Sequence, residues 1–359
     1  MRMFAVRRAL EWVEQGRIPD AVVRRGIRAL LRARLDGLEA HNAEAAAALT
    51  ERFVAHMDAA AVAPLAALAN QQHYEVPASF FEQVLGPNRK YSSCLFEPGC
   101  TSLAAAEQAA LRVTCQRAVL IDGQDVLELG CGWGSLSLWM AAHYPASRIT
   151  AVSNSNSQRE YIAAQATARG FKNLQVITCD MNLFDAGQSY DRIVSVEMFE
   201  HMRNWRALFE RVASWLRVDG KFFMHVFCHR AVPYAFEVSG PEDWMSQHFF
   251  SGGMMPSDEL PVRFQDHLKL SARWRWDGRH YEQTANAWLA NMDAHRTEIW
   301  PILESLYGAA EALRWWSRWR MFFMSCAELW GMDSGQQWWV SHYLYTRRAL
   351  GTPHTLDRT

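Results

Sequence analysis

Two carboxylates and an imidazole occur within five residues of one another, in the segment EMFEH that begins at Glu197. They follow the apolar run Asp191–Val196, and ligands bind at the carboxyl ends of the strands in open α/β sheets. A Glu–His pair can hold or remove a proton, and a second carboxylate beside aromatic faces can stabilise a cation. We therefore predict Glu197, Glu200 and His201 as catalytic groups around an amine, with His201 near its unperturbed pKa of about 6.5. The alternative is an acid-rich helix N-terminus that the helix dipole favours.

A glycine-rich loop follows another apolar run, Asp125–Leu129. Its sequence, E-x-G-x-G-x-G, supplies Glu128, Gly130, Gly132 and Gly134. Glycines are needed where the chain turns sharply or where backbone approaches a ligand closely. A dinucleotide-binding loop would read G-x-G-x-x-G, with an acid about 20 residues later for the ribose. The tighter triplet, with neutral residues at the next strand end, is typical of S-adenosylmethionine (SAM) methyltransferases; a purely structural turn is the alternative.

The ends of the following strands carry further groups that suit this cofactor. With the last residue of the fourth strand, the predicted cofactor-binding residues are Ser153, Asn154, Gln158, Asp180, Met181, Asn182 and Val196. The neutral side chains after the second strand can bond ribose hydroxyls, although Ser and Asn can equally cap the next helix. After the third strand, an acid can accept from the adenine amino group and a methionine can pack on the ring. Taken alone, that acid is as often a surface turn residue.

Short apolar runs alternate with helical periodicity between residues 125 and 230. The runs are Asp125–Leu129, Arg148–Val152, Leu174–Thr178, Asp191–Val196 and Lys221–Phe227, and the helical stretches are Ser135–His143, Gln158–Ala168 and Trp205–Leu216. This alternation predicts βαβ units and a doubly wound, Rossmann-like α/β sheet. We expect an N-terminal helical region (1–70), a cofactor-binding core (71–230), a lid and aromatic substrate-binding region that completes the sheet (231–345) and a tail (346–359).

Composition narrows the class of protein further. The 359 residues carry a formal net charge of −1, which provides no field for binding nucleic acid. Seven cysteines form no C-x-x-C pair, so neither a metal site nor a disulfide framework is indicated, and a cytoplasmic location is expected. No apolar run reaches the roughly 18 residues that span a bilayer. Ten of the 16 tryptophans lie between Trp274 and Trp339, which predicts either a dense core or an aromatic-walled pocket.

The chain resembles the cyclopropane-fatty-acid synthase superfamily, and within it the branch of the coclaurine N-methyltransferases. The matching segments are KYSSCLF, LELGCGWGSLSLWMA, SNSNSQREYI, YDRIVSVEMFEHMRNW, HFFSGGMMPS, DGRHYEQTANAWL and RMFFMSCAELWG. They extend over nearly the whole chain, and the segments FEHM and GGMMPS are more specific than the glycine loop. The resemblance implies SAM as cofactor, S-adenosylhomocysteine as product and no metal.

The resemblance also implies roles for single residues. Tyr91 and Ser92 would help to hold the cofactor. Cys326 matches a cysteine treated as the family's active-site residue, but within an aromatic helix we expect it to pack as a small hydrophobe. Apart from the resemblance, we expect residues 1–70 and the HFFSGGMMPS segment to cover the cofactor site, with Gly252 and Gly253 giving backbone freedom to a moving lid.

The lipid-modifying branch of the superfamily uses a bound bicarbonate as its base. This chain keeps matches to several ligands of that bicarbonate, namely Glu200, His225 and Tyr281. It departs from the lipid enzymes at Ser93, where they carry a cysteine, and at Glu197, where they carry a small residue. We therefore expect a SAM-dependent N-methyltransferase acting on a small aromatic or cyclic amine of benzylisoquinoline type. Methyl or methylene transfer to a lipid double bond is the alternative. A third interpretation is a non-catalytic cofactor-binding module or an enzyme with another methyl acceptor. The sequence leaves open whether the chain forms a homodimer.

Overall fold

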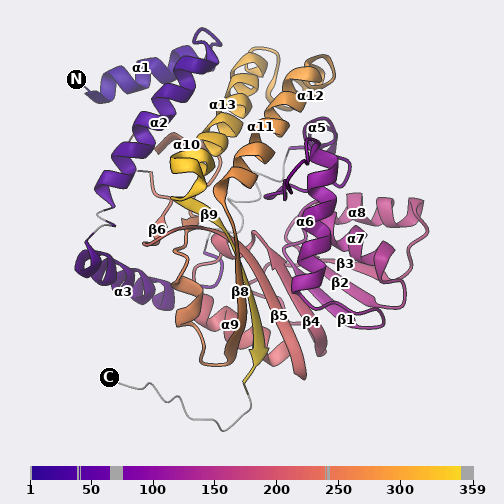
Figure 1. Cartoon of the computed structure of the whole chain (residues 1–359). Coiled ribbons are helices and arrows are strands. Elements are labelled where there is room, and N and C mark those ends of the chain that lie inside the picture. The colour runs from indigo at the N-terminus through magenta and orange to yellow at the C-terminus, as the bar shows by residue number, and fades with distance from the viewer. Residues whose placement is uncertain are drawn as a thin grey trace.

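The computed structural model describes residues 2–38, 40, 42–64, 76–238, 240 and 243–348, with side chains from residue 8 onward. Its centre is a seven-stranded sheet in the order β3-β2-β1-β4-β5-β9-β8 (Figure 1). The strands are β1 (Asp125–Leu129), β2 (Arg148–Ser153), β3 (Leu174–Thr178), β4 (Tyr190–Val196), β5 (Leu216–His229), β8 (Leu268–Trp276) and β9 (Trp338–Arg347). Strands β1 to β5 are parallel, and β9 is antiparallel to both of its neighbours. The predicted doubly wound sheet is confirmed.

The predicted strand bounds agree with the structure except in β5. This strand begins at Leu216 because Leu216 already pairs with Tyr190 of β4, five residues before the predicted start. Its last residues extend past the neighbouring parallel strands and pair with β9 as far as Trp338. The strand order reverses between β1 and β4, so the crevice at their carboxyl ends is where a ligand is expected.

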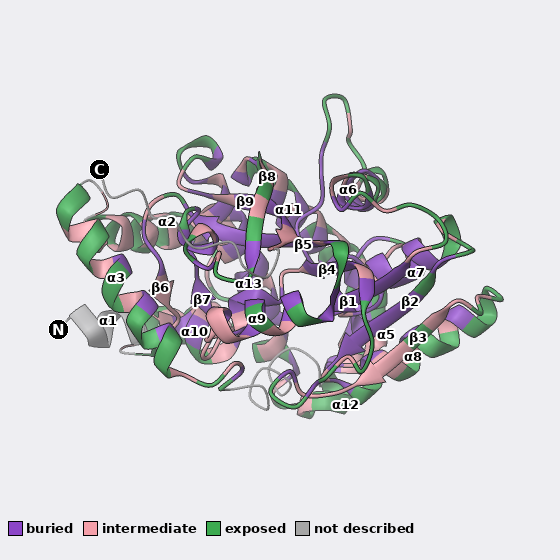
Figure 2. Ribbon diagram, turned by 90° about the horizontal axis from the view of Figure 1, so that it is seen from below, coloured by how far each residue is buried: buried purple, intermediate pink, exposed green. Residues whose placement is uncertain are grey.

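Helices cover both faces of the sheet. On one face, α6 (Leu103–Arg117) and α7 (Ser135–His143) pack on β1, β2, β4 and β5, with α8 (Asn156–Ala168) beside them. On the other face, α9 (Trp205–Trp215) packs on the same sheet and α3 (Ala43–Ala59) packs on α9. Figure 2 shows β1 and β2 buried, while the outer surfaces of α3 and α8 are exposed. The glycine loop therefore emerges from a strand that is buried along its whole length.

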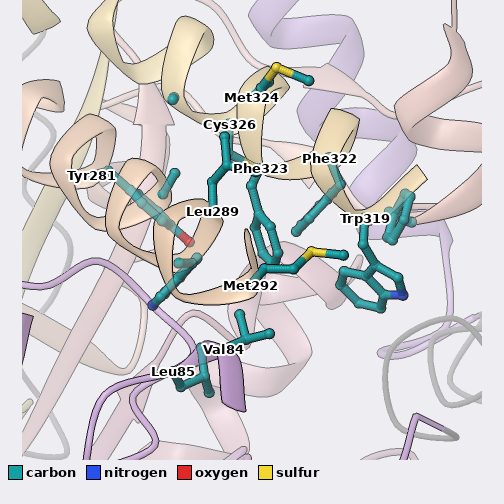
Figure 3. Close-up of a cluster of buried hydrophobic side chains, with 14 of the residues drawn as sticks. Val84, Leu85, Tyr281, Leu289, Met292, Trp319, Phe322, Phe323, Met324 and Cys326 are labelled. Carbon is teal, nitrogen blue, oxygen red and sulfur yellow. The ribbon is translucent and has the colours of Figure 1, made fainter. Parts of the chain in front are cut away.

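A helical layer stands at the carboxyl edge of the sheet. It comprises α5 (Ala78–Val84), α11 (Gly278–Ala294), α12 (Arg296–Tyr307) and α13 (Ala312–Gly331). The side chains of α11 and α13 interleave over the end of α5, as Figure 3 shows for Leu289, Met292, Phe322 and Phe323 above Val84. Met292 and Phe323 are both fully buried, so their packing holds α11 and α13 against each other.

The predicted N-terminal helical region contains α1 (Arg2–Glu14), α2 (Asp20–Gly37) and α3. Helices α1 and α2 pack on α13, whereas α3 packs on α9. Helix α2 lies along α13 (Figure 1), held by Arg24 and Arg28, which bind Glu328 at 2.9 and 2.6 Å. The remaining short elements are α10 (Trp244–His248), the paired β6 (Tyr234–Ala235) and β7 (Met254–Met255), and the 3₁₀ helices η2 (Phe199–His201), η4 (Leu260–Arg263) and η5 (Met332–Gly335). Residues 349–359, most of the predicted tail, lie outside the described residues.

Candidate active site

Two cavities meet at the carboxyl edge of the sheet. A cleft lies beside the glycine loop, at the ends of β1, β2 and β3. A larger cavity of about 840 Å³ is lined by residues of α2, α10, α11 and α13. Glu197 and His201 line both of them. Two of the three predicted catalytic residues are thus placed where the contents of the two cavities would touch.

The cleft contains much of the predicted cofactor site. Six predicted residues line it: Gly130, Gly132, Ser153, Asn154, Gln158 and Met181. A Cβ added at Gly132 would meet no protein atom within 4 Å, so this glycine leaves space that the protein itself does not fill. The buried Nε2 of Gln158 finds no partner among the described residues, while its Oε1 accepts from Ser153 Oγ at 2.6 Å. Helix α8 is capped by Ser155, so neither Ser153 nor Asn154 is needed as a cap.

Two predicted cofactor residues lie behind the cleft. Glu128 is 2% exposed and accepts a hydrogen bond from Ser137 Oγ, and burial raises the pKa of its carboxyl group to about 8. Gly134 begins α7 with φ +77°, and a Cβ there would lie 2.6 Å from the Ile162 side chain. The third glycine is therefore required by packing of α7 on α8 and by its left-handed backbone.

The residues after β3 hold in place a segment from after α3 that lines the cleft. Asn182 holds both backbone groups of Ala63: Ala63 N donates to its Oδ1 at 2.9 Å, and its Nδ2 donates to Ala63 O at 2.8 Å. Ala63 lines the cleft. Asp180 accepts from the backbone N–H of Asn182 at 2.8 Å, which is the geometry of a turn. The segment after α3 is thus attached to the predicted adenine end of the site.

The other residues implied by the resemblance lie nearer to the larger cavity or outside both. Tyr91 lines the larger cavity, and Ser92 accepts from Lys90 Nζ at 2.5 Å. Val196 ends β4, half-buried, directly before Glu197. Residues that the sequence analysis did not single out also line the cleft, namely Ala63, Cys179, Met198, Met202 and Ser251. Cys179, Met198, Met202 and Ser251 lie next to predicted site residues in the sequence, and this is the only signal that could have indicated them. No feature of the sequence indicated Ala63.

Glu197 sits at the junction in an unusual backbone conformation. Its φ is +49°, in the left-handed region that glutamate rarely adopts, and its N–H donates to the carbonyl of His225 at 2.9 Å. Its carboxylate accepts hydrogen bonds from Ser93 N at 2.9 Å and from Tyr281 OH at 2.7 Å, and its Oε1 lies 3.1 Å from His225 Nε2. Burial raises the pKa of Glu197, and the nearby Lys90 ammonium opposes that rise. The carboxylate is held at a fixed position and is a stronger base than an exposed glutamate.

Glu200 and His201 are arranged differently from one another. Glu200 is 1% exposed, its Oε1 accepts from Phe227 N at 2.7 Å, and its Oε2 has no partner among the described residues. Burial and the charge of Glu197 raise the pKa of Glu200 well above its usual value, which favours the neutral carboxyl group. Burial lowers the pKa of His201 to about 4. The expectation that His201 titrates near neutrality is therefore wrong, because the protein packed around this partly buried ring disfavours its charged form.

The larger cavity has aromatic and apolar walls with one polar end at Glu197. Tyr281 stacks on Trp330 with ring centroids 4.7 Å apart, and Trp288 lies edge-on to Tyr281. Cys326 lines the wall near them, and burial raises the pKa of its thiol, so it carries no thiolate at neutral pH. The tryptophan-rich segment thus forms both a core and a pocket wall: Trp288, Trp319 and Trp330 are all buried, and Trp288 and Trp330 also line the cavity.

The larger cavity is closed by segments from both ends of the chain. Its lining includes residues of α2 between Ile27 and Arg34, together with Cys326 and its neighbours on α13. The HFFSGGMMPS segment lies beside the junction: Arg203 donates to the carbonyl of Gly252 at 2.8 Å, and Gly252 has φ +75°. Whether this segment opens as a lid stays a prediction. Among the described residues, no helix is long and apolar enough to cross a membrane, and no group of three or more His, Cys, Asp or Glu could hold a metal ion.

Comparisons with known proteins agree with this arrangement. The sequence profile of the family called mycolic acid cyclopropane synthetase matches residues 65–338. The chain is 34% identical to an (S)-coclaurine N-methyltransferase of Thalictrum flavum subsp. glaucum, over 94% of this chain and 95% of that one. It is 28% identical to the cyclopropane-fatty-acyl-phospholipid synthase of Escherichia coli K12, over 67% of this chain and 59% of that one. A crystal structure of coclaurine N-methyltransferase bound to N-methylheliamine and SAH superposes with a TM-score of 0.92, at 34% identity, covering 95% and 99% of the two chains.

The sheet order, the glycine loop and these similarities define a SAM-dependent methyltransferase. Within that class, the chain belongs to the mycolic acid cyclopropane synthetase family. The predicted resemblance to this superfamily and to its coclaurine N-methyltransferase branch is confirmed.

Proposed function

We propose that this enzyme transfers a methyl group from SAM to the nitrogen of a small aromatic or cyclic amine of benzylisoquinoline type. The observation that carries the proposal is that Glu197 and His201 line both the cleft and the aromatic cavity. A methyl donor in the cleft and an amine in the cavity would then meet beside a buried carboxylate. The names of the relatives support an amine, since they include coclaurine N-methyltransferase.

SAM would bind in the cleft, where it supplies an electrophilic methyl group on a sulfonium. Gln158 fits this ligand, because its unpartnered buried Nε2 can donate to a ribose hydroxyl. The empty space at Gly132 admits ligand atoms close to the backbone. Ser153, Asn154 and Met181 complete the side-chain lining that would hold the cofactor.

Glu197 would act on the amine. A bound ammonium ion is attracted to this carboxylate and to the aromatic faces of the cavity. Only the free amine has a lone pair to attack, so a proton must leave nitrogen before or during transfer, and Glu197 is the group with the raised pKa that can accept it. His201, neutral at physiological pH, can accept a hydrogen bond from the amine N–H but is a weak base. The raised pKa of Glu200 disfavours a second negative charge beside Glu197.

The position of the Glu197 carboxylate argues against the lipid alternative. The resemblance to the lipid branch implies that residues matching His225 and Tyr281 hold a bicarbonate there. Here both of those side chains donate to Glu197 instead, so the carboxylate occupies their donor groups. An enzyme with a built-in carboxylate at this point has no need of a bicarbonate base.

The test is a panel of small amines incubated with SAM, with products read by mass for a gain of one methyl group. A phospholipid with an unsaturated acyl chain is the comparison substrate, and both reactions are run with and without bicarbonate. We expect methylated cyclic amines at a rate that bicarbonate does not change. Methylene addition to the lipid with a strict bicarbonate requirement would establish the alternative.

A further inference from the structure

A row of hydrogen bonds leads from Glu197 away from both cavities to the end of helix α6. Glu197 Oε1 lies 3.1 Å from His225 Nε2, His225 Nδ1 lies 3.0 Å from His342 Nε2, and His342 Nδ1 lies 2.8 Å from Arg117 Nη1. His225 on β5 and His342 on β9 are paired in register, and neither has any exposed surface. The Arg117 guanidinium lies over the rings of Trp274 and Trp276, at 5.2 and 5.5 Å.

Only one direction of hydrogen-bond donation is consistent along the row, from Arg117 towards Glu197. Arginine can donate but cannot accept, so His342 Nδ1 must accept the bond from Arg117. Burial lowers the pKa of both histidines well below the usual value, so each ring is neutral and carries one proton. His342 then carries its proton on Nε2 and donates to His225 Nδ1, which leaves the His225 proton on Nε2, aimed at Glu197 Oε1. Burial lowers the pKa of Arg117 to about 10, which still leaves it charged at neutral pH.

We infer that Arg117 and His342 are positioning residues that fix the tautomer of His225 and thereby hold Glu197 ionised and oriented towards the amine. This inference rests on the proposed function, in which an ionised Glu197 is required. No carboxylate forms an ion pair with Arg117 in the described part of the chain, and the half-buried guanidinium, stacked on two tryptophans, has the His342 ring as its hydrogen-bond acceptor. The row ends in a permanent donor, so it cannot carry a proton away from Glu197, and the amine proton must leave through the cavities.

Other groups also act on Glu197, and they stay in place when Arg117 is changed. Besides His225, the ionisable groups that face it are Lys90, Cys94, Glu200, His201, Tyr281 and Cys326. Ser93 N completes its hydrogen-bond donors. Without the Arg117 donor, His342 and His225 can reverse their tautomers and present an unprotonated Nε2 to Glu197. That arrangement repels the carboxylate, so the ionised form becomes less stable and its pKa must rise.

The test compares the pH dependence of kcat/KM for Arg117→Met and Arg117→Lys with that of the natural enzyme. For Arg117→Met we expect the acid limb to move up by about one pH unit, which is roughly a tenfold loss of rate on that limb. Arg117→Lys, which keeps a charged donor, should restore most of it. Arg192→Met is the control, since Arg192 is more deeply buried than Arg117 but donates to the carbonyl of Val119, outside this row. A rate loss in Arg117→Met that is equal at every pH would overturn the inference.

A second measurement does not depend on activity. In the full-length protein with ¹⁵N-labelled histidine, the nitrogen shifts of His225 should report a proton on Nε2, and Arg117→Met should reduce that population. If Arg117→Met does not fold, Arg117→Gln serves in both experiments, because its amide can reverse and fixes no direction. A His225 proton on Nδ1 in the natural protein would refute the inference even if every amine is methylated. Conversely, the expected tautomer with no methylated amine would refute only the proposed function.

Discussion

Replacing Glu197 by glutamine should abolish most of the activity without unfolding the protein. The carboxylate accepts from Ser93 N and His225 Nε2 through Oε1, and from Tyr281 OH through Oε2. A glutamine can place its carbonyl oxygen towards the first two donors and its NH₂ towards the tyrosine hydroxyl, which can also accept. The side chain therefore keeps its shape and its bonds but loses its charge and its ability to take up a proton.

The expected size of the loss follows from this loss of charge. A carboxylate about 4 Å from a cationic nitrogen contributes about 4 kcal/mol at an effective dielectric constant of 20. Since about 1.4 kcal/mol corresponds to tenfold in rate, kcat/KM should fall by about 10³. Stability should behave oppositely: burial raises the pKa of Glu197, so keeping it ionised at pH 8 costs free energy of folding, which glutamine does not. The melting temperature of Glu197→Gln should equal or exceed that of the natural enzyme.

The assay is methylation of whichever amine the panel identifies, with thermal unfolding of each variant measured in parallel. Glu282→Gln is the matched control, because Glu282 is on α11 beside Tyr281 and burial also raises the pKa of its carboxyl group, yet it lines neither cavity. We expect the control to keep its rate within about threefold, since surface-side substitutions rarely exceed about 0.5 kcal/mol. Activity of Glu197→Gln within tenfold of the natural enzyme would refute the assignment of Glu197 as the group that acts on the amine.

Three further predictions test the cofactor cleft and the catalytic cluster. Gly132→Val should lose SAM binding, measured by calorimetry. Gly170→Val is the control, because Gly170 has φ +71° and equally open surroundings, so the variant has similar backbone strain and should bind SAM normally. Equal SAM binding by both variants would remove the glycine loop from the site. Burial raises the pKa of Glu128 from 4.5 to about 8. The free energy of unfolding of the apoprotein should therefore fall as the pH rises from about 4.5 to about 8, by at most about 1.4 kcal/mol per pH unit. Glu128→Gln should remove most of this fall, as measured by urea unfolding. Glu200→Ala and His201→Ala should each lower kcat for amine methylation by about 10² or more, independently of bicarbonate, and full activity in both would return the lipid alternative.

The sheet and the glycine loop could be predicted because local sequence determines them. The run Asp125–Leu129 is buried along its whole length, so its apolar pattern is continuous, and the strand observed has the same bounds. The glycines of the loop have positive φ, which their residue type already indicated. The cluster after β4 was also predictable as a site, because polar residues at the carboxyl end of a parallel strand meet the same crevice.

Contacts between distant segments could not be predicted in this way. The pairing of Asn182 with Ala63 joins residues 119 apart, and no periodicity or spacing indicates it. The same holds for the wall that α2 contributes to the aromatic cavity and for the approach of Arg117 to His342. The lowered pKa of His201 could not be predicted for a related reason, since it depends on which distant segments pack around the ring.

The conformation of Glu197 connects the fold to the proposed chemistry. A glutamate at φ +49° is strained by about 1–2 kcal/mol, and it persists only where its surroundings determine it. Here the backbone N–H is bound by the carbonyl of His225 and the carboxylate by three donors from separate segments. A relaxed backbone at this position would turn the side chain away from that set of donors. The strained turn after β4 thus brings one carboxylate to the boundary of two cavities, and the row that begins at Arg117 keeps it there as an acceptor.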